Sequence, residues 1–487
     1  MEPAPEQLMA LASRLRAEGR AAEAAEAYRR LLAVRPDLPD SWYNLALMER
    51  ACGRFEAALA AYDEALRRGV SGPEEVRLNR AVILTDDLGR HDLAEAELEA
   101  ALALRPDWPP ALLNLGNLHE DLGRREAARA AYERALKVEP GDAVALARLA
   151  GLARPAGADD PIVLRLRTAL AEPGRSPEER AELGFALARA LDAAGAWDAA
   201  FEACAAANAA SRGAEPGAVY DRAEREAFVD RLIAAFPQAA PASGDEAAGP
   251  VFVCGLFRSG STLVEQILAG HSAVTGGGEL GLVPALAARI RPYPEALTGP
   301  QAAATARRAR ELYLQGLRAA RPGAALVVDK RPDNVLHIGL IKAMFPTARI
   351  VHTVRQPLDV ILSNWFLHLD RSMPQALDLE DMAHWTLQHD RLMAHWKRLY
   401  PDILEIDYDR LVVEPRPMVE GLLAWLGLPW EDAVMDFHTA ATGVRTASVW
   451  QVREPLYRRS SGRWRNYAAH LRPARAMLGL PPEEGRG

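Results

Sequence analysis

The chain has 487 residues, about half of them apolar and a quarter charged, so we expect two or three globular domains with separate cores. A formal net charge of −8 argues against a dedicated DNA- or RNA-binding protein, which would normally be basic. An acidic N-terminal stretch, apolar runs all shorter than about 18 residues and three scattered cysteines predict a cytoplasmic, reducing setting, with no membrane span and no zinc site.

Residues 5–150 repeat with a period of about 34 residues. Glycine–arginine pairs recur at spacings of 34, 36 and 34 residues, and nine residues after each glycine stands a tyrosine or a leucine. The glycines are Gly19, Gly53, Gly89 and Gly123, and the residues that follow them are Tyr28, Tyr62, Leu98 and Tyr132. The third unit departs from the pattern, with two extra residues and the leucine.

This pattern resembles tetratricopeptide repeats, in which each unit is a helix-turn-helix that packs on the next. The resemblance implies an α-helical repeat solenoid of four units. Such a solenoid has a concave surface, so we expect it to bind a protein or peptide. The alternative is a scaffold or an oligomerisation arm.

After the repeats we expect a helical connector over residues 151–236, with a fifth repeat-like unit at 180–213, and a linker over 237–250. Residues 251–487 then form an α/β domain. Short apolar runs at 251–255, 325–329, 348–354 and 402–407 are typical of strands, and helical stretches separate them. This alternation predicts a mostly parallel sheet, whose ligands bind beyond the carboxyl ends of the strands.

The first strand runs into "GLFRSGST", in which Gly255 and Gly260 have the spacing of a nucleotide-binding P-loop. Its lysine is missing, because Ser261 and Thr262 follow the second glycine directly. Backbone amides and the helix start still favour an anion, and Arg258 adds a cation. The loop therefore predicts a phosphate site that is less suited to a nucleoside triphosphate.

Three later positions add charged or hydroxyl groups beside strand ends. Lys330 ends a strand in "ALVVDK", where Asp329 imitates a magnesium ligand. Arg355 ends another strand, and Ser363 follows eight residues later in a helix that begins with Pro357. This pair could hold a second phosphate, although Ser363 alone could equally bond its own helix.

Together the two phosphate segments resemble the 5′- and 3′-phosphosulfate-binding motifs of the sulfotransferase family, whose donor is 3′-phosphoadenosine 5′-phosphosulfate (PAPS). The resemblance covers about residues 250–470 and is closest to the tyrosylprotein sulfotransferase type. It implies a P-loop-like sulfotransferase fold in which Arg355 and Ser363 bind the 3′-phosphate and Tyr408 contacts the nucleotide. The implied 5′-phosphate ligands are Arg258, Ser259, Gly260, Ser261 and Thr262.

The resemblance also implies the catalytic residues. Glu279 follows Arg258 by 21 residues, the spacing at which the tyrosylprotein type carries its general base, and Lys330 matches the lysine beside the transferred sulfuryl group. Ser448 and Arg463 stand at the serine and basic positions of the C-terminal segment. The resemblance implies that Arg463 binds the donor nucleotide, although the family often has lysine there. No metal is expected. Arg258 and Ser448 would join Glu279 and Lys330 in catalysis.

The repeat array that precedes this domain favours a protein or peptide acceptor, and the resemblance to the tyrosylprotein type implies a tyrosine hydroxyl. A saccharide or small-molecule hydroxyl stays open as an alternative. Two other functions remain open: a P-loop kinase-like phosphotransferase, which Asp329 supports, and a non-catalytic adaptor that works through its repeats. His384, His389 and His395 share one expected helix at spacings of five and six residues. They do not stack on one face, so we interpret them as surface or packing residues.

Overall fold

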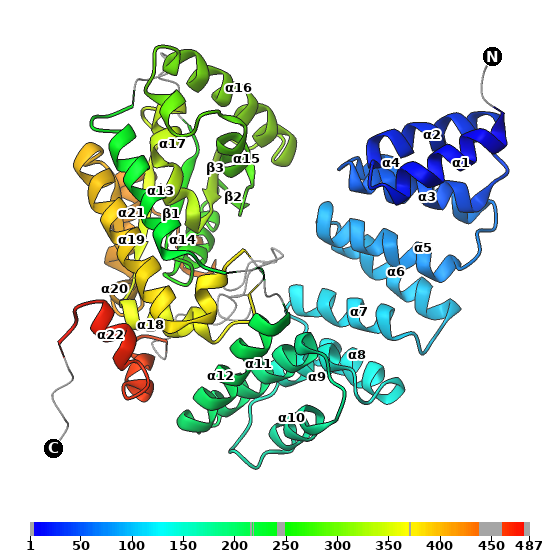
Figure 1. The fold of residues 1–487 in the computed structure, drawn as a ribbon, viewed down its shortest axis with the longest axis horizontal. Helices are drawn as coiled ribbons and strands as arrows, with labels where there is room; N and C mark the ends of the chain where they lie inside the picture. The colour runs from blue at the N-terminus through cyan, green and yellow to red at the C-terminus, as the bar shows by residue number, and fades with distance from the viewer. Residues whose placement is uncertain are drawn as a thin grey trace. The chain divides into compact units, whose positions relative to one another are not determined.

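The computed structural model describes residues 4–214, 217, 219–240, 249–369, 372–437 and 460–481. The chain divides into two compact units, Met1–Ala153 and Arg154–Gly487. Figure 1 shows helices throughout the first unit and a sheet covered by helices in the second. The predicted order, a helical repeat array followed by an α/β domain, is therefore confirmed.

The first unit consists of helices that pack in consecutive antiparallel pairs. Each glycine of the repeated pairs has a positive φ between 65° and 73° in the turn between two helices, a conformation that glycine adopts at little cost. The helices are α1 (Pro5–Ala17), α2 (Ala21–Val34), α3 (Pro39–Ala51), α4 (Phe55–Arg67), α5 (Pro73–Val82), α6 (His91–Leu104), α7 (Pro109–Asp121), α8 (Arg125–Val138) and α9 (Ala143–Gly151).

The repeated aromatic positions form the core of this unit. Tyr28, Tyr62 and Tyr132 are all at most 1% exposed, and so is Leu98 in the irregular third unit. That unit takes up part of its extra length in a π-helical turn over Ile83–Asp87 directly after α5. The departure seen in the sequence thus becomes a local change in helix winding.

Four helices begin the second unit: α10 (Pro161–Ala171), α11 (Pro177–Ala193), α12 (Trp197–Ala214) and α13 (Arg222–Ala235). The sequence divides them from the α/β domain as a connector, whereas in the structure they belong to the same compact unit as the sheet. Cys204 and Asn208 of α12 both donate hydrogen bonds to the carbonyl oxygen of Trp365, at 3.1 and 3.0 Å. Part of the predicted linker, residues 241–248, lies outside the described residues.

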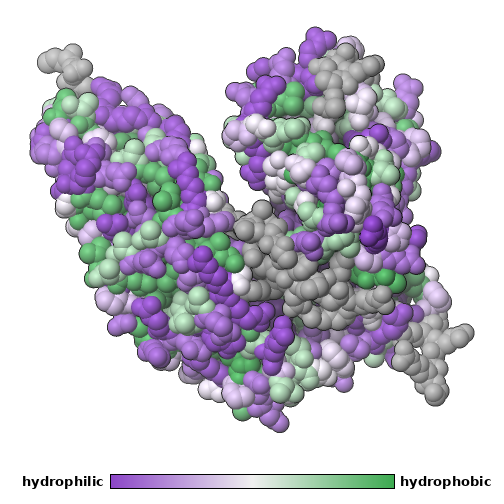
Figure 2. All heavy atoms as spheres, turned by 180° about the vertical axis from the view of Figure 1, so that it is seen from behind, coloured by the Kyte–Doolittle hydropathy of each residue, from purple (hydrophilic) through white to green (hydrophobic). Residues whose placement is uncertain are grey.

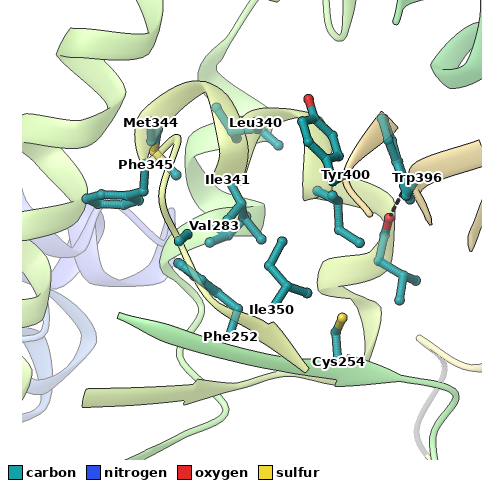
Figure 3. Packing of buried hydrophobic residues seen from close by; sticks show 14 of the residues in the cluster. Phe252, Cys254, Val283, Leu340, Ile341, Met344, Phe345, Ile350, Trp396 and Tyr400 are labelled. Atoms are coloured by element: carbon teal, nitrogen blue, oxygen red, sulfur yellow. Dashed lines mark hydrogen bonds between the residues drawn. The ribbon is translucent and has the colours of Figure 1, made fainter. Parts of the chain in front are cut away.

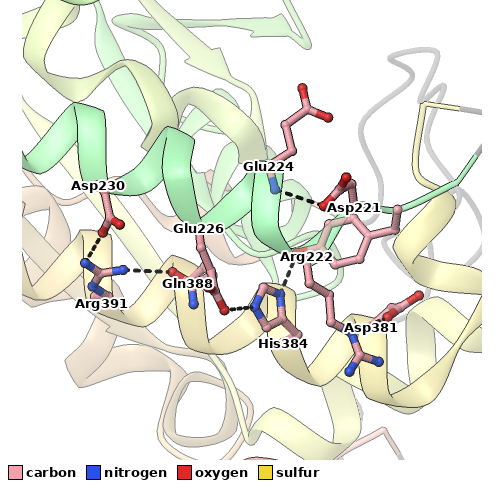
Figure 4. Close-up of polar contacts among 10 residues, drawn as sticks. Asp221, Arg222, Glu224, Glu226, Asp230, Asp381, His384, Gln388 and Arg391 are labelled. Carbon is pink, nitrogen blue, oxygen red and sulfur yellow. Dashed lines mark hydrogen bonds and ion pairs between the residues drawn. The ribbon is translucent and has the colours of Figure 1, made fainter.

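Polar side chains fasten α13 to the long helix α19 (Leu379–Leu399). His384 lies between the hydroxyl of Tyr220, at 2.9 Å, and the carboxylate of Glu226, at 2.8 Å (Figure 4). Arg222 pairs with Asp381 at 2.6 Å in the same view. These contacts, together with buried apolar residues of α13, make this helix a layer of the α/β domain.

The sheet has five parallel strands in the order β2-β3-β1-β4-β5. They are β1 (Val251–Gly255), β2 (Val274–Gly278), β3 (Leu326–Lys330), β4 (Ile350–Val354) and β5 (Leu404–Asp407). Four of them fall on the strand segments expected from the sequence. The sequence analysis missed β2, because "VTGGG" lacks the run of β-branched residues that marks a strand.

The central strand β1 is fully buried and supplies side chains to cores on both faces of the sheet. Phe252 and Cys254 join one core, whereas Val251 and Val253 join the other, as the alternation of side chains along a strand requires. Figure 3 shows Phe252 and Cys254 in the first core. Cys254 is 1% exposed, so it packs as an apolar residue.

Helices cover both faces of the sheet. The α-helices that follow β1 in the described chain are α14 (Ser261–Ala269), α15 (Leu282–Arg289), α16 (Ala302–Ala320), α17 (Ile338–Met344), α18 (Pro357–Trp365), α19, α20 (Tyr408–Leu411), α21 (Pro415–Leu426) and α22 (Arg472–Met477). Among the described residues, no helix is long and apolar enough to cross a membrane. Hydrophobic and hydrophilic residues are interspersed on the face drawn in Figure 2.

Candidate active site

The loop between β1 and α14 is shaped by close backbone contacts. Gly260 has a φ of 103°, and a Cβ there would lie 2.7 Å from the ring of Tyr408. A Cβ at Gly255 would lie 2.5 Å from the carbonyl oxygen of Thr353 on β4. Glycine is therefore required at both ends of the loop, and the first turn of α14, with Ser261 and Thr262, starts directly after it.

Ser259 is committed to the loop itself. Its hydroxyl donates to the carbonyl oxygen of Leu256 at 2.6 Å and lies 2.7 Å from the hydroxyl of Thr353, and the residue is 1% exposed. Arg258 has a positive φ of 71°, which is uncommon for a residue with a side chain. Such local strain is frequent in functional loops.

Residues from distant segments meet at this loop. Nε of Arg258 donates to the hydroxyl of Ser363 on α18 at 3.1 Å, and Nη1 of Arg355 donates to the carbonyl oxygen of Arg258 at 3.0 Å. The guanidinium of Arg355 stacks 4.7 Å above the ring of Tyr408. The structure thus brings Arg258, Arg355, Ser363 and Tyr408 together around Gly260.

Arg355 also carries an unused donor. Its Nε is buried and has no hydrogen-bond partner among the described residues, which is rare for a buried polar group. The same guanidinium contacts Arg258 and Tyr408 at the start of α14, where helix geometry favours an anion. Both observations fit an anionic ligand at this end of the sheet.

A carboxylate and an ammonium group form a second cluster. Nζ of Lys330, at the end of β3, lies 2.5 Å from Oε1 of Glu279, which follows β2. The Lys330 side chain is fully buried, whereas 37% of the Glu279 side chain is exposed. Because β2 and β3 are neighbouring parallel strands, their ends present these two groups side by side.

The sequence analysis missed the buried carboxylate of Glu265. It lies in the second turn of α14, is 4% exposed, and its Oε1 accepts a hydrogen bond from the backbone nitrogen of Gly278 at 2.6 Å. Burial raises the pKa of Glu265, while the positive charge of Lys330 and the Gly278 hydrogen bond oppose that rise. A charged residue inside the apolar run "LVEQIL" was the signal that could have revealed it.

Two predicted residues stand apart from these clusters. Ser448 lies outside the described residues. Arg463 pairs with Asp192 of α11, with Nη2 2.9 Å and Nε 3.1 Å from Oδ1, and Tyr467 donates to the same oxygen at 2.6 Å. The guanidinium of Arg463 is thus held by a helix of the connector segment, and its contact with a nucleotide stays a prediction.

The three histidines of α19 do not gather at one point. His384 contacts Tyr220 and Glu226 as described above, whereas His389 lies 3.4 Å from His352 and His395 lies 3.1 Å from Arg398. All three are at most 7% exposed, so they are packing residues and not surface groups. The described part of the chain holds no cluster of three or more histidine, cysteine or acidic residues suited to a metal.

Comparison with known proteins matches residues 250–432 to the model of the sulfotransferase family. Tetratricopeptide-repeat models match residues 9–73, 50–109 and 109–142. A sulfotransferase-family domain and a tetratricopeptide-repeat array are therefore confirmed. The narrower likeness to the tyrosylprotein type is not supported by these matches.

An uncharacterized protein of Aquifex aeolicus (strain VF5) is 34% identical over 340 residues, which are 66% of this chain and 44% of that protein. The match thus spans less than half of that relative's length. The sulfotransferase domain from the Synechococcus PCC 7002 olefin synthase is 21% identical, with a TM-score of 0.35, over 47% of this chain and 90% of the domain. The one from the curacin biosynthetic pathway is 18% identical, with a TM-score of 0.35, over 49% of this chain and all of the domain.

Proposed function

We propose that the protein transfers a sulfuryl group from PAPS to an acceptor hydroxyl. The observation that carries this proposal is the 2.5 Å pair of Glu279 and Lys330 beside a lysine-free phosphate loop. A base and a buried cation at the ends of neighbouring strands suit a reaction in which a hydroxyl loses a proton while charge builds on a leaving phosphate.

The phosphate loop and its surroundings would hold the donor. Amides of the loop and the start of α14, with the hydroxyls of Ser261 and Thr262, would bind its 5′-phosphate. Arg355, with its unpaired Nε, and Ser363 would bind the 3′-phosphate, and Tyr408 would contact the nucleotide. Both the hydroxyl and the backbone amide of Ser259 already donate to the carbonyl oxygen of Leu256, so Ser259 would support the shape of the loop and would not contact the phosphate itself.

In the reaction, the acceptor oxygen would form a bond to sulfur while the bond from sulfur to the 5′-phosphate oxygen breaks. Glu279 would take the hydroxyl proton. Lys330 and Arg258 would stabilise the negative charge on the departing 5′-phosphate. Ser448 would donate a hydrogen bond to the same phosphate. As in phosphoryl transfer, positioning and electrostatics would supply most of the rate enhancement.

The kinase-like alternative fits the site less well. Its magnesium ligand would be Asp329, which is fully buried and whose Oδ2 accepts a hydrogen bond from Tyr313 at 2.7 Å. Burial raises the pKa of Asp329 to about 7, and its burial and its hydrogen bond to Tyr313 leave little access for a hydrated magnesium ion. An acceptor on a protein or peptide, recognised by the repeat array, is the substrate class that we favour.

The base assignment is tested by replacing Glu279 with glutamine. We expect Glu279→Gln to lower sulfate transfer from labelled PAPS at least 100-fold, the size typical of losing a general base. Binding of 3′-phosphoadenosine 5′-phosphate, followed by calorimetry, should stay unchanged, because the nucleotide ligands are intact. Full activity in this variant would refute the role of Glu279, and an inactive wild-type protein that binds a peptide would favour the adaptor.

A further inference from the structure

We propose that Glu265 and Arg321 are positioning residues that hold the turn carrying Glu279 against the end of β3. Neither residue was predicted from the sequence to take part in the site. The role in turnover rests on the proposed function, whereas the clamp itself is a property of the fold. The two can therefore be tested separately.

The turn at residues 276–278 needs contacts from outside because it consists of glycine alone. Residues 276–278 are three glycines, the pairing of β2 with β3 is irregular between Gly276 and Gly278, and Gly278 has a φ of 72°. Glycine gains more conformational freedom than other residues when it is not held. Without outside contacts, Glu279 would inherit the mobility of this turn.

The side chain of Glu265 holds the turn by accepting a hydrogen bond from a backbone amide of the turn. Its Oε1 accepts the hydrogen bond from the nitrogen of Gly278, one residue before Glu279, at 2.6 Å. A Cβ built at Gly276 would lie 3.5 Å from the same oxygen, so the carboxylate group also lies close to the first glycine of the turn. Because this hydrogen bond lies in the buried interior, it is electrostatically stronger than one exposed to water.

The side chain of Arg321 holds the same turn by donating hydrogen bonds to backbone carbonyl groups of the turn. It follows the last residue of α16, and it donates from Nε to the oxygen of Gly276 at 3.1 Å and from Nη2 to the oxygen of Gly277 at 2.9 Å. Donors from one helix and an acceptor from another thus fix three consecutive residues. The two helices are separated by β2 and α15 in the chain, so the clamp forms only in the folded domain.

Charge gives Glu265 a second connection to the site. It is buried, and the positive charge of Lys330 stabilises its ionised form. Lys330 therefore interacts with two carboxylates, Glu279 by direct contact and Glu265 through the field.

The test compares Glu265→Ala, Glu265→Gln and Arg321→Met in the full chain. Since a displacement of about 1 Å can lower a rate about 100-fold, we expect kcat for sulfate transfer to fall about 100-fold in Glu265→Ala and in Arg321→Met. Glu265→Gln keeps an acceptor for Gly278 but loses the charge, so about tenfold is expected. KM for PAPS should change less than about twofold, because the phosphate loop is untouched.

The matched control is Glu311→Gln, which removes a carboxylate that is 58% exposed and paired with Arg308 on α16. It should leave kcat and KM unchanged. A kcat of Glu265→Ala or Arg321→Met within twofold of the wild type would overturn the positioning role. So would a large rise in KM for PAPS, which would mean that the variants disturb the nucleotide site.

Hydrogen–deuterium exchange tests the clamp without activity. In Glu265→Ala, the peptide covering residues 274–280 should exchange at least tenfold faster than in the wild type, and Glu265→Gln should lie between them. Equal exchange in all three proteins would overturn the clamp. If the wild type transfers no sulfate but this exchange pattern is found, the proposed function fails and the clamp stands.

Discussion

Asp329 shows how a single buried residue links the site to the stability of the fold. Burial raises its pKa to about 7, whereas an aspartate in an unfolded chain has a pKa near about 4. Between these values the folded protein holds a proton that the unfolded chain has released. The free energy of unfolding therefore falls as the pH rises from about 4 to about 7.

Replacing Asp329 with asparagine should remove this dependence. We expect the wild-type protein to lose about 1 kcal/mol of stability per pH unit relative to Asp329→Asn across that window. Urea denaturation at pH 4.5, 5.5 and 6.5 measures the difference. Parallel pH dependences in the two proteins would show that Asp329 is not protonated in the fold.

The loop from Gly255 to Thr262 is the element on which the proposed nucleotide binding would depend. Its geometry comes from positions where only glycine fits, and Gly260 in particular lets Tyr408 and Arg355 approach the loop. A side chain at Gly260 would need a strained φ of 103° and would push against the ring of Tyr408. The glycines of the motif are therefore needed for the backbone shape of the loop, whatever ligand it binds.

We expect Gly260→Ala to weaken binding of 3′-phosphoadenosine 5′-phosphate by about ten- to 100-fold, since strain of this kind costs about 1–3 kcal/mol. Calorimetry with the purified variant measures the change. Gly281→Ala is the matched control, because a Cβ at Gly281 meets nothing within 4 Å and its φ is −79°. Equal affinities in both variants would contradict the role of Gly260 as a required glycine.

At the same scale, sequence patterns predicted most strands and both ends of the phosphate loop. Strands rich in valine and isoleucine can be recognised in the sequence. The three glycines that end β2 have low strand propensity, so this strand could not be recognised. The meeting of Glu279 with Lys330 was expected only from the resemblance, as their contact depends on strand order. The apolar run "LVEQIL" around Glu265 indicates that this acid is buried, but its hydrogen bond to Gly278 depends on how α14 packs against β2 and could not be predicted.

Over the whole molecule, the main difference from the sequence analysis is the place of residues 154–236. They belong to the compact unit of the sheet. The ring of Phe236 in this segment packs against that of Trp396 in the core, with 5.4 Å between the ring centroids. The pair of Asp192 and Arg463 spans 271 residues. No short-range pattern could reveal such a contact, because it exists only once distant segments have folded together.

For the whole molecule, we propose that the group transferred is a sulfuryl group and not a phosphoryl group. The most direct measurement supplies the purified full-length protein with ³⁵S-labelled PAPS, γ-³²P-labelled ATP and magnesium in one reaction, together with a peptide mixture rich in tyrosine and serine, and follows both labels into product. We predict that ³⁵S is incorporated, that ³²P is not, and that Glu279→Gln abolishes the ³⁵S signal. Incorporation of ³²P without ³⁵S would contradict it.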